Sequence, residues 1–302
     1  MIKKSLFSIL ITIFITSMAL AEQEVSVILS QGIIPYHLSV EGVKKKMSGF
    51  RFREYTLEKG SNKGQKILRS LEREEPDLIL SVGPEAACLL KDFNTPSPRI
   101  FTMILNPEKI FPETLPFPGV SMNYPPSTLL SFLEKAFPER KKIGIFYSPD
   151  LNSNLLKQFE KEGGRLGLKI RPFPINSSTE IRSTLKSPLF DPDIILFIPD
   201  QVIIKKKLVN YIIEECLFRK IPAIGFNTWF ARSGALMAFY LDYEEVGRQT
   251  GELALKFLEN KKREPWIEAP RNLRIILNLR VARKFDIKIS EKITAEADQV
   301  IE

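Results

Sequence analysis

The chain has 302 residues, with 44 Lys and Arg residues against 36 Asp and Glu residues and a formal net charge of +8. This length favours two lobes over one. Its single histidine excludes a two-histidine metal site and gives little support to a catalytic triad.

The N-terminus has the pattern of a secretory signal peptide. Lys3 and Lys4 precede a short apolar stretch, and Ala19 and Ala21 are the small residues typical of a cleavage site. The apolar stretch is shorter than the roughly 20 residues that span a bilayer, which argues against a membrane anchor. We therefore expect a signal peptide over residues 1–21, cleavage after Ala21 and a periplasmic protein. Loss of Lys3 and Lys4 takes the formal charge from +8 to +6 (8 − 2).

Three basic clusters follow in the chain, namely Lys44–Lys46, Lys205–Lys207 and Lys261–Arg263. Each lies on or beside a predicted surface helix, and they neither alternate with aromatic residues nor gather on one motif. An exported protein also rarely meets nucleic acid. We interpret the clusters as solvated helix faces and expect no nucleic-acid partner.

Cys88 and Cys216 are the two cysteines, in predicted helices of different halves of the chain. An exported protein could join them in a disulfide. Their apolar neighbours favour buried free thiols instead. His37 is most simply a residue of a loop or a helix start.

Apolar runs alternate with amphipathic segments along the rest of the chain. The predicted strands are Val25–Ser30, Asp77–Val82, Ile100–Leu105, Ile143–Tyr147, Ile194–Ile198 and Ala223–Phe226. The clearest predicted helices are Gly64–Arg73, Leu129–Phe137, Asn154–Leu166 and Ile203–Arg219. Continuous apolar strands between helices predict an α/β fold with parallel sheets that are covered by helices on both faces.

An internal similarity supports two lobes of related structure. The segment EEPDLILSVG at Glu74–Gly83 matches FDPDIILFIP at Phe190–Pro199. Further on, SPRIFTMILN ends at Asn106 and IPAIGFN ends at Asn227. Because both features occur in the same order in both halves, we interpret them as a structural repeat rather than a chance resemblance.

Small polar residues follow the predicted strands, where parallel sheets bind ligands and helix N-termini present free N–H groups. These candidate ligand-binding residues are Ser30, Gln31, Gly83, Asn106, Ser148, Asn152, Ser153, Asp200 and Asn227. Each one could equally be a helix cap, because caps use the same residue types.

The segments from Val120 onward resemble the solute-binding proteins of an ABC-importer family whose better-known members bind aromatic amino acids such as tryptophan and phenylalanine. The block DYEEVGRQTG at Asp242–Gly251 is the most specific part, with Gly234-Ala235-Leu236 before it. The resemblance implies a periplasmic binding protein of type I, with two lobes that are joined by three hinge crossovers and close on a solute. It adds Glu85, Asn123 and Asp242 to the candidate ligand-binding residues, and it implies no enzymatic activity and no cofactor.

The sequence departs from the family pattern at the expected pocket. Pro84 stands where the family usually has a hydroxyl residue, and Asn106 replaces a common Asp. The spacing from Asn152-Ser153 to Gly167 is one residue shorter than usual, and the segment Thr56–Ile67 has few of the usual features. We therefore expect the family scaffold with an altered pocket.

If the solute is an amino acid, Asp242 is placed to hold its ammonium group, with Ser148 and Asn152 or Ser153 receiving its carboxylate. The alternative is that Asp242 caps a helix over Tyr243–Asn260, since Asp is a favoured N-cap.

The expected function is capture of a small polar solute for an ABC importer, with an aromatic amino acid as the favoured class. The expected partners are the permease, contacted directly by a monomeric protein, and its ATPase. The alternative is a ligand sensor that presents solute to a receptor or histidine kinase. No Gly-x-Ser-x-Gly motif, Gly-rich phosphate loop or metal-ligand spacing occurs, so we predict neither an enzyme nor a metal site.

The expected lobes are residues 22–123 plus 242–263, and residues 124–241 plus 264–302. The hinge crossovers are then expected near Ser121–Asn123, near Tyr240–Asp242 and after Pro265.

Overall fold

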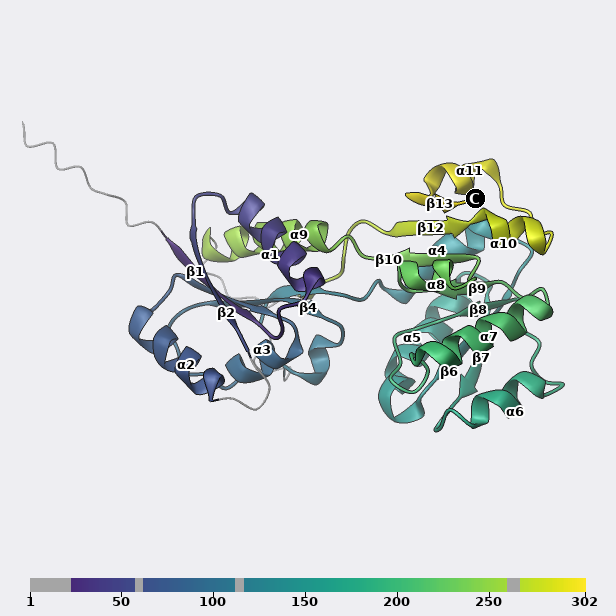
Figure 1. Cartoon of the computed structure of the whole chain (residues 1–302), viewed down its shortest axis with the longest axis horizontal. Helices are drawn as coiled ribbons and strands as arrows, with labels where there is room; N and C mark the ends of the chain where they lie inside the picture. The colour runs from purple at the N-terminus through teal and green to yellow at the C-terminus, as the bar shows by residue number, and fades with distance from the viewer. Residues whose placement is uncertain (1–22, 58–61, 112–116, 260–266) are drawn as a thin grey trace, which may run out of the picture.

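The computed structural model describes residues 23–57, 62–111, 117–259 and 267–302, which form two α/β lobes (Figure 1). The first lobe has a six-stranded sheet of order β11-β5-β4-β3-β1-β2, and the second has a seven-stranded sheet of order β13-β12-β10-β9-β8-β6-β7. The predicted two-lobe α/β class is thus confirmed. The predicted signal peptide and Lys261–Arg263 lie outside the described residues.

The elements of the first lobe come from two separate parts of the chain. Its strands are β1 (Glu24–Leu29), β2 (Arg51–Thr56), β3 (Leu78–Val82), β4 (Arg99–Ile104), β5 (Gly119–Ser121) and β11 (Ile267–Glu268). Its helices are α1 (Ile34–Lys46), α2 (Lys63–Glu74), α3 (Pro84–Leu90), the short 3-10 helix η1 (Pro107–Lys109) and α9 (Tyr243–Glu259).

The second lobe holds the remaining elements. Its strands are β6 (Lys142–Tyr147), β7 (Lys169–Pro174), β8 (Ile194–Leu196), β9 (Ala223–Gly225), β10 (Met237–Tyr240), β12 (Arg274–Asn278) and β13 (Gln299–Ile301). Its helices are α4 (Pro126–Ala136), α5 (Pro149–Arg165), α6 (Glu180–Lys186), α7 (Lys206–Phe218), α8 (Thr228–Arg232), α10 (Leu279–Lys284) and α11 (Glu291–Glu296). The sheet is parallel except that β12 pairs with β10 in the antiparallel direction.

Both faces of each sheet are buried, as continuous apolar strands require. In β1, Val27 belongs to a core with helices α1 and α9, whereas Ile28 belongs to a core with α2 and α3 on the opposite face. Two further cores cover the two faces of the second sheet. Among the described residues, no helix is long and apolar enough to cross a membrane.

The structural repeat predicted from the sequence is confirmed by matching hydrogen bonds. Asp77 accepts a hydrogen bond from the N–H of Glu24 at 2.8 Å where β1 begins, and Asp193 accepts one from the N–H of Lys142 at 2.8 Å where β6 begins. The order β2-β1-β3-β4-β5 in the first sheet corresponds to β7-β6-β8-β9-β10 in the second. Each Pro-Asp dipeptide therefore fastens two neighbouring strands of its own lobe.

The third crossover follows Pro265, as expected, but the first lobe extends beyond its expected end at residue 263. Strand β11 pairs with β5 in the first sheet, and β12 lies in the second sheet. The chain therefore returns to the second lobe between Glu268 and Arg274 rather than at residue 264, because Ile267 and Glu268 complete the edge of the first sheet.

The Tyr124 hydroxyl connects the three crossovers. It lies on the first crossover and faces the carbonyl oxygen of Tyr240 on the second at 3.1 Å and that of Asn272 on the third at 2.6 Å. One hydroxyl hydrogen serves one acceptor at a time, so the bond is shared between the two carbonyls. Burial raises the pKa of Tyr124 to about 12, so the hydroxyl stays a donor at neutral pH.

The two cysteines are free. Cys216 is buried as expected, and burial raises its pKa to about 12. The expectation of burial was wrong for Cys88, which is exposed because it lies on the outer face of α3. His37 lies in the first turn of α1 and is exposed.

Two glycines let α1 pack closely on α9. A Cβ atom at Gly247 would lie 1.9 Å from the backbone oxygen of Ser39, and one at Gly42 would lie 2.0 Å from the backbone oxygen of Glu244. These distances are far below van der Waals contact, so either side chain would force the helices apart.

We predict that Gly247→Ala lowers the free energy of unfolding by about 1–3 kcal/mol, because overpacking displaces two helix backbones. The matched control is Gly164→Ala in α5, where an added Cβ meets nothing within 4 Å. That change should be neutral or stabilise by up to about 1 kcal/mol. Urea unfolding of both variants checks this, and equal stabilities would contradict the close packing.

We predict that Tyr124→Phe lowers the free energy of unfolding by about 1 kcal/mol, because one hinge carbonyl loses its donor. Amide hydrogen exchange of residues 268–274 should become faster. Tyr211→Phe is the control, since the Tyr211 hydroxyl hydrogen bonds to no described residue and its ring contacts Arg182. Unchanged exchange near Asn272 would show that the hydroxyl does not hold the hinge.

Candidate functional site

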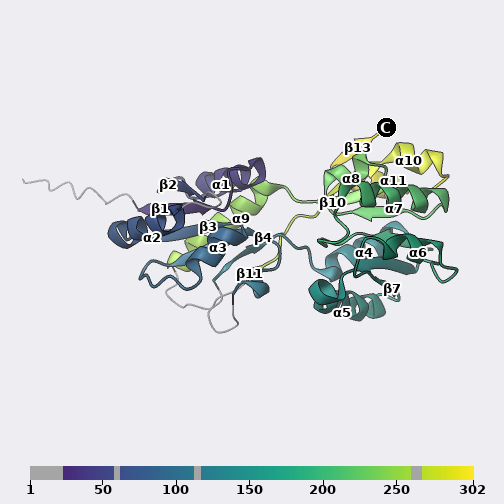
Figure 2. The same ribbon diagram turned by 60° about the horizontal axis from the view of Figure 1, so that its bottom comes forward.

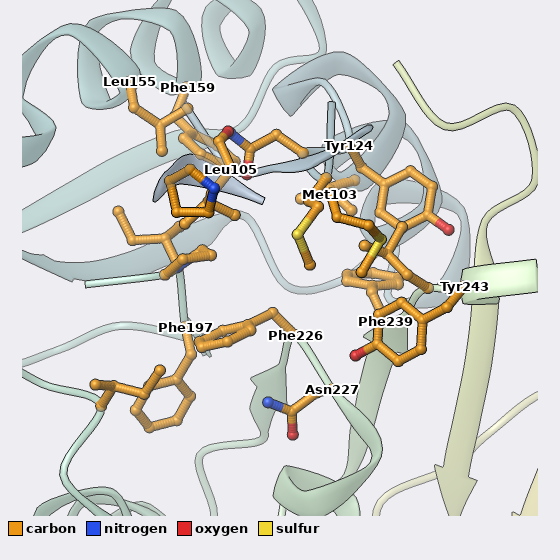
Figure 3. A pocket seen from close by; sticks show the side chains of 18 of the residues that line it. Met103, Leu105, Tyr124, Leu155, Phe159, Phe197, Phe226, Asn227, Phe239 and Tyr243 are labelled. Carbon is orange, nitrogen blue, oxygen red and sulfur yellow. The ribbon is translucent and has the colours of Figure 1, made fainter. Parts of the chain in front are cut away.

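Figure 2 shows the two lobes joined by the hinge crossovers. A cavity of about 390 Å³ lies between the lobes beside this hinge, and we call it the aromatic cavity (Figure 3). Its aromatic lining residues are Tyr36, Tyr124, Phe159, Phe197, Phe226, Phe239 and Tyr243. Its other lining residues are Pro84, Met103, Leu105, Met122, Asn123, Leu129, Leu155, Ile198, Pro199, Ile204, Asn227 and Leu241. None of them is charged, so the cavity is suited to an apolar ring with few polar groups.

Strand ends place the main apolar side chains of the cavity. Phe197 follows β8 and Phe226 follows β9, so both emerge at the carboxyl edge of the second sheet. In the first lobe, the pairing of β4 with β5 shifts in register between Thr102 and Ile104. Met103 lies at this bulge with a φ of 60° and lines the cavity. A bulge re-aims a side chain in this way, here toward the second lobe.

Both lobes and the hinge contribute to this cavity. Figure 3 shows Met103 and Leu105 of the first lobe gathered with Phe197 and Phe226 of the second. The hinge adds Tyr124 among others. A change in the angle between the lobes would therefore change the size and shape of the cavity.

A second cavity, of about 710 Å³, adjoins the first and shares Asn123, Tyr124 and Leu155 with it. We call it the polar cavity, because its lining includes charged and amide side chains. These are Asn106, Glu108, Lys109, Asn123, Asp150, Asn152, Asn154 and Gln158. Lys109 Nζ donates to the backbone oxygen of Leu151 at 2.7 Å and so bridges the lobes at this cavity.

Asp200 is the centre of a buried hydrogen-bond network in the second lobe. Its carboxylate accepts hydrogen bonds from the N–H and the hydroxyl of Ser148, each at 2.7 Å, from Asn152 Nδ2 at 2.8 Å and from the N–H of Val202 at 2.9 Å. Burial raises the pKa of the Asp200 carboxyl, but the hydrogen bonds from Ser148, Asn152 and Val202 outweigh burial and lower the pKa overall. Asp200 is therefore ionised at neutral pH.

The start of α5 differs from the predicted start at Asn154. The helix begins at Pro149, with Ser148 as its N-cap residue, because proline is well suited to the first helical position. Asn152 and Ser153 thus lie within the helix rather than before it. The Ser153 hydroxyl donates to the backbone oxygen of Pro149. We expected the carboxylate of an amino-acid solute at Ser148, but the carboxylate of Asp200 occupies that position.

Three predicted residues of the first lobe lie near Tyr36, namely Ser30, Gly83 and Glu85. The Ser30 hydroxyl accepts a hydrogen bond from the N–H of Ala86 at 2.9 Å and so caps α3. Gly83 has a φ of 90°, and a Cβ atom there would lie 2.6 Å from Tyr36 Oη. Glu85 is exposed in the first turn of α3. Burial, and then the charge of Glu85, raise the pKa of Tyr36.

Of the predicted residues, Asn123 and Asn227 line the aromatic cavity, and Asn106, Asn123, Asn152 and Ser153 line the polar cavity. Asn123 Nδ2 donates to the backbone oxygen of Leu105 and to Asn106 Oδ1. Asn227 Oδ1 accepts a hydrogen bond from the N–H of Trp229 at 3.0 Å and caps α8. Asn227 thus has both a capping role and a place in the cavity wall.

The other predicted residues line neither cavity, namely Ser30, Gln31, Gly83, Glu85, Ser148, Asp200 and Asp242. Asp242 Oδ1 accepts a hydrogen bond from the N–H of Glu245 at 3.2 Å, and Oδ2 lies 3.7 Å from Arg274 Nη2. Asp242 therefore caps α9, as the alternative interpretation expected, and it also joins the second hinge crossover to the third.

The apolar lining residues of the aromatic cavity were not among the predicted site residues. Phe226 directly precedes Asn227, and Phe197 lies two residues before Pro199. Each directly follows a strand, so a position at a strand end is the sequence signal that marks both residues. Within the described ranges, no group of His, Cys, Asp and Glu residues could hold a metal ion.

Comparisons with known proteins agree with this architecture. The family model for ABC transporter substrate-binding proteins matches residues 21–301. A tyrosine-binding protein from Clostridioides difficile is 26% identical over 209 residues, which are 65% of this chain and 59% of that protein. The chain therefore aligns with less than two thirds of that relative's length.

Two solved structures share the fold. A ligand-free, open structure of a substrate-binding protein with adhesive properties from Clostridium difficile has a TM-score of 0.77 and 17% identity, over 93% of this chain and 99% of that chain. An ABC domain in complex with L-Trp from Streptococcus pneumoniae has a TM-score of 0.63 and 20% identity, over 93% of this chain and 100% of that chain. These likenesses confirm the periplasmic-binding-protein type I fold. The chain belongs to the family of ABC transporter substrate-binding proteins.

Proposed function

We propose that this chain is the solute-binding protein of an ABC importer and holds a small solute with an aromatic group in the aromatic cavity. The composition of that cavity carries the proposal. Rings from both lobes and from the hinge surround a space of about 390 Å³, within the size range of small-molecule sites. Rings of the protein prefer tilted or offset contacts with a ligand ring, which add to the gain from apolar burial.

The relatives support the aromatic part of this proposal. One is a tyrosine-binding protein, and another was solved in complex with L-Trp. An aromatic amino acid is therefore the first solute class to test. Which polar groups the solute carries depends on the hydrogen-bond donors and charges beside the cavity. These residues differ from the family pattern at Pro84 and Asn106.

Binding in this cavity would couple to motion of the lobes. A solute that contacts Met103 of the first lobe and Phe226 of the second stabilises the arrangement in which both contacts form. Three crossovers join the lobes, and a few hinge residues can absorb the backbone change. The solute would thereby favour closure, and closure would signal occupancy to the permease.

The family supports a proposal for the cellular setting. Its substrate-binding proteins are extracytoplasmic and are not enzymes. We propose that this chain acts in the periplasm as a monomer, contacts the permease directly and delivers solute for transport that the ATPase drives. A sensor would share the cavity but would not need the permease, so import of labelled solute by cells that contain and lack the permease separates the two roles.

We predict that the exported protein begins at Glu22, because Ala19 and Ala21 present the small side chains that signal peptidase accepts. Intact-mass measurement of protein purified from the periplasm checks this. Retention of residues 1–21 in that material would contradict the proposed location.

We predict that Phe226→Ala weakens solute binding by about 2 kcal/mol, because truncation removes a ring from the cavity wall. Mass spectrometry of small molecules released from purified, denatured protein identifies the solute, and calorimetry measures its affinity. The matched control is Phe218→Ala, which truncates a side chain that is 87% exposed and does not line the cavity.

Thermal melts of both variants separate binding from folding, since Phe226 also packs on Phe230 with ring centroids 4.7 Å apart. Equal affinity of the two folded variants would exclude the aromatic cavity as the binding site.

A further inference from the structure

A solute carboxylate needs hydrogen-bond donors, and the donors at the start of α5 are already in use. Ser148 donates its N–H and its hydroxyl to Asp200, each at 2.7 Å. Asn152 Nδ2 donates to Asp200 at 2.8 Å and to the backbone oxygen of Pro199 at 3.3 Å. The Ser153 hydroxyl donates to the backbone oxygen of Pro149. A solute carboxylate here would have to break these bonds.

The negative charge of Asp200 also disfavours a second carboxylate at the start of α5. Asp200 is 4% exposed and ionised, and its oxygens occupy the position in front of Ser148. Two carboxylates that share a site repel each other unless one takes up a proton. The protein therefore supplies the anion that a solute would otherwise bring.

Inside the aromatic cavity, a solute ammonium group lacks a partner as well. The described lining of the aromatic cavity contains no carboxylate. Asp242 lies outside that lining and is held by the N–H of Glu245 and by Arg274. A charge placed among apolar side chains without a counter-charge costs much more than an uncharged polar group that finds a hydrogen bond.

Uncharged donors remain available in the same cavity. Asn227 uses its Oδ1 to cap α8, while its Nδ2 hydrogen bonds to no other residue in the described part of the chain. The hydroxyls of Tyr36 and Tyr243 are also without hydrogen-bond partners there. Burial raises the pKa of both tyrosines, so both hydroxyls keep their protons.

We propose that the solute of this chain is an uncharged aromatic molecule with a hydrogen-bond acceptor, such as an amide carbonyl, rather than a zwitterionic amino acid. The proposal rests on the proposed function, because it assumes that the aromatic cavity is the binding site. Asn227 Nδ2 and the hydroxyls of Tyr36 and Tyr243 donate hydrogen bonds to the acceptor of the solute. The negative charge of Asp200 excludes solutes that carry a carboxylate.

Four ligands with the same ring test this on the unmodified protein. They are L-phenylalanine, L-phenylalaninamide, N-acetyl-L-phenylalanine and N-acetyl-L-phenylalaninamide, which carry both charges, the cation only, the anion only and no charge. The same four ligands with an indole ring form a second series. Calorimetry should show the uncharged ligand binding at least tenfold more tightly than the zwitterion, about 1.4 kcal/mol, in whichever series binds better.

The outcomes separate this proposal from the proposed function. Tightest binding of the zwitterion would overturn the uncharged solute and leave aromatic solute binding intact. Failure of all eight ligands to bind would overturn both, because the ring itself would then have no place in the cavity.

The variant Asp200→Asn tests whether the charge of Asp200 excludes carboxylates. It keeps the shape of the side chain and removes its charge, so N-acetyl-L-phenylalanine should gain at least tenfold in affinity relative to N-acetyl-L-phenylalaninamide. Asp191→Asn is the control, since Asp191 pairs with Lys142 and Arg171 on the surface of the same lobe. Thermal melts check that both variants are folded. If the ratio of the two ligand affinities is the same in Asp200→Asn as in the unmodified protein, Asp200 does not exclude carboxylates.

Discussion

The buried carboxylate of Asp200 joins the two segments that form the second-lobe side of the cleft. It accepts hydrogen bonds from Ser148 and Asn152 at the start of α5 and from Val202 in its own loop. The first two turns of α5 carry Leu155 and lead to Phe159, and the Asp200 loop carries Ile204; all three line the aromatic cavity. A buried charge left without its partners is strongly unfavourable, so this network fixes the cavity wall as a unit. The same carboxylate decides which charges a solute can carry.

The aromatic cavity depends equally on the hinge. Tyr124 lines the cavity and also hydrogen bonds across the crossovers, and Asp242 with Arg274 holds the second crossover to the third. A ligand that contacts the ring of Tyr124 therefore touches the residue that couples the three connections. Close packing of α1 on α9 holds these two helices of the first lobe together next to the second crossover.

Much of the fold could be predicted because it is encoded in local patterns. The alternation of apolar strands and helices gave the α/β class, and the repeated Pro-Asp dipeptides gave the two related lobes. The start of α5 was placed too late, although Ser148 followed by Pro149 is a recognisable helix start. Strand β11 was missed because two paired residues at a sheet edge leave no periodic signal.

The site could be predicted only in part. The strand-end rule found Asn227 and the family resemblance found Asn123, and both residues line the aromatic cavity. It could not show that Ser148 and Asn152 face Asp200, because that pairing depends on how two loops of one lobe meet. Phe197 and Phe226 resemble core residues in sequence, and a positive φ at Met103 has no sequence signature for a residue with a side chain. These features arise from tertiary packing.

A crystal structure of the protein with its co-purified solute would test the central claim most directly, since it would show both the location and the chemistry of the ligand. The account predicts an aromatic ring among Met103, Phe226 and Tyr243, an acceptor of the solute facing Asn227 Nδ2, and Asp200 still bound to Ser148. A solute carboxylate bound to Ser148 and Asn152, with Asp200 displaced, would contradict it.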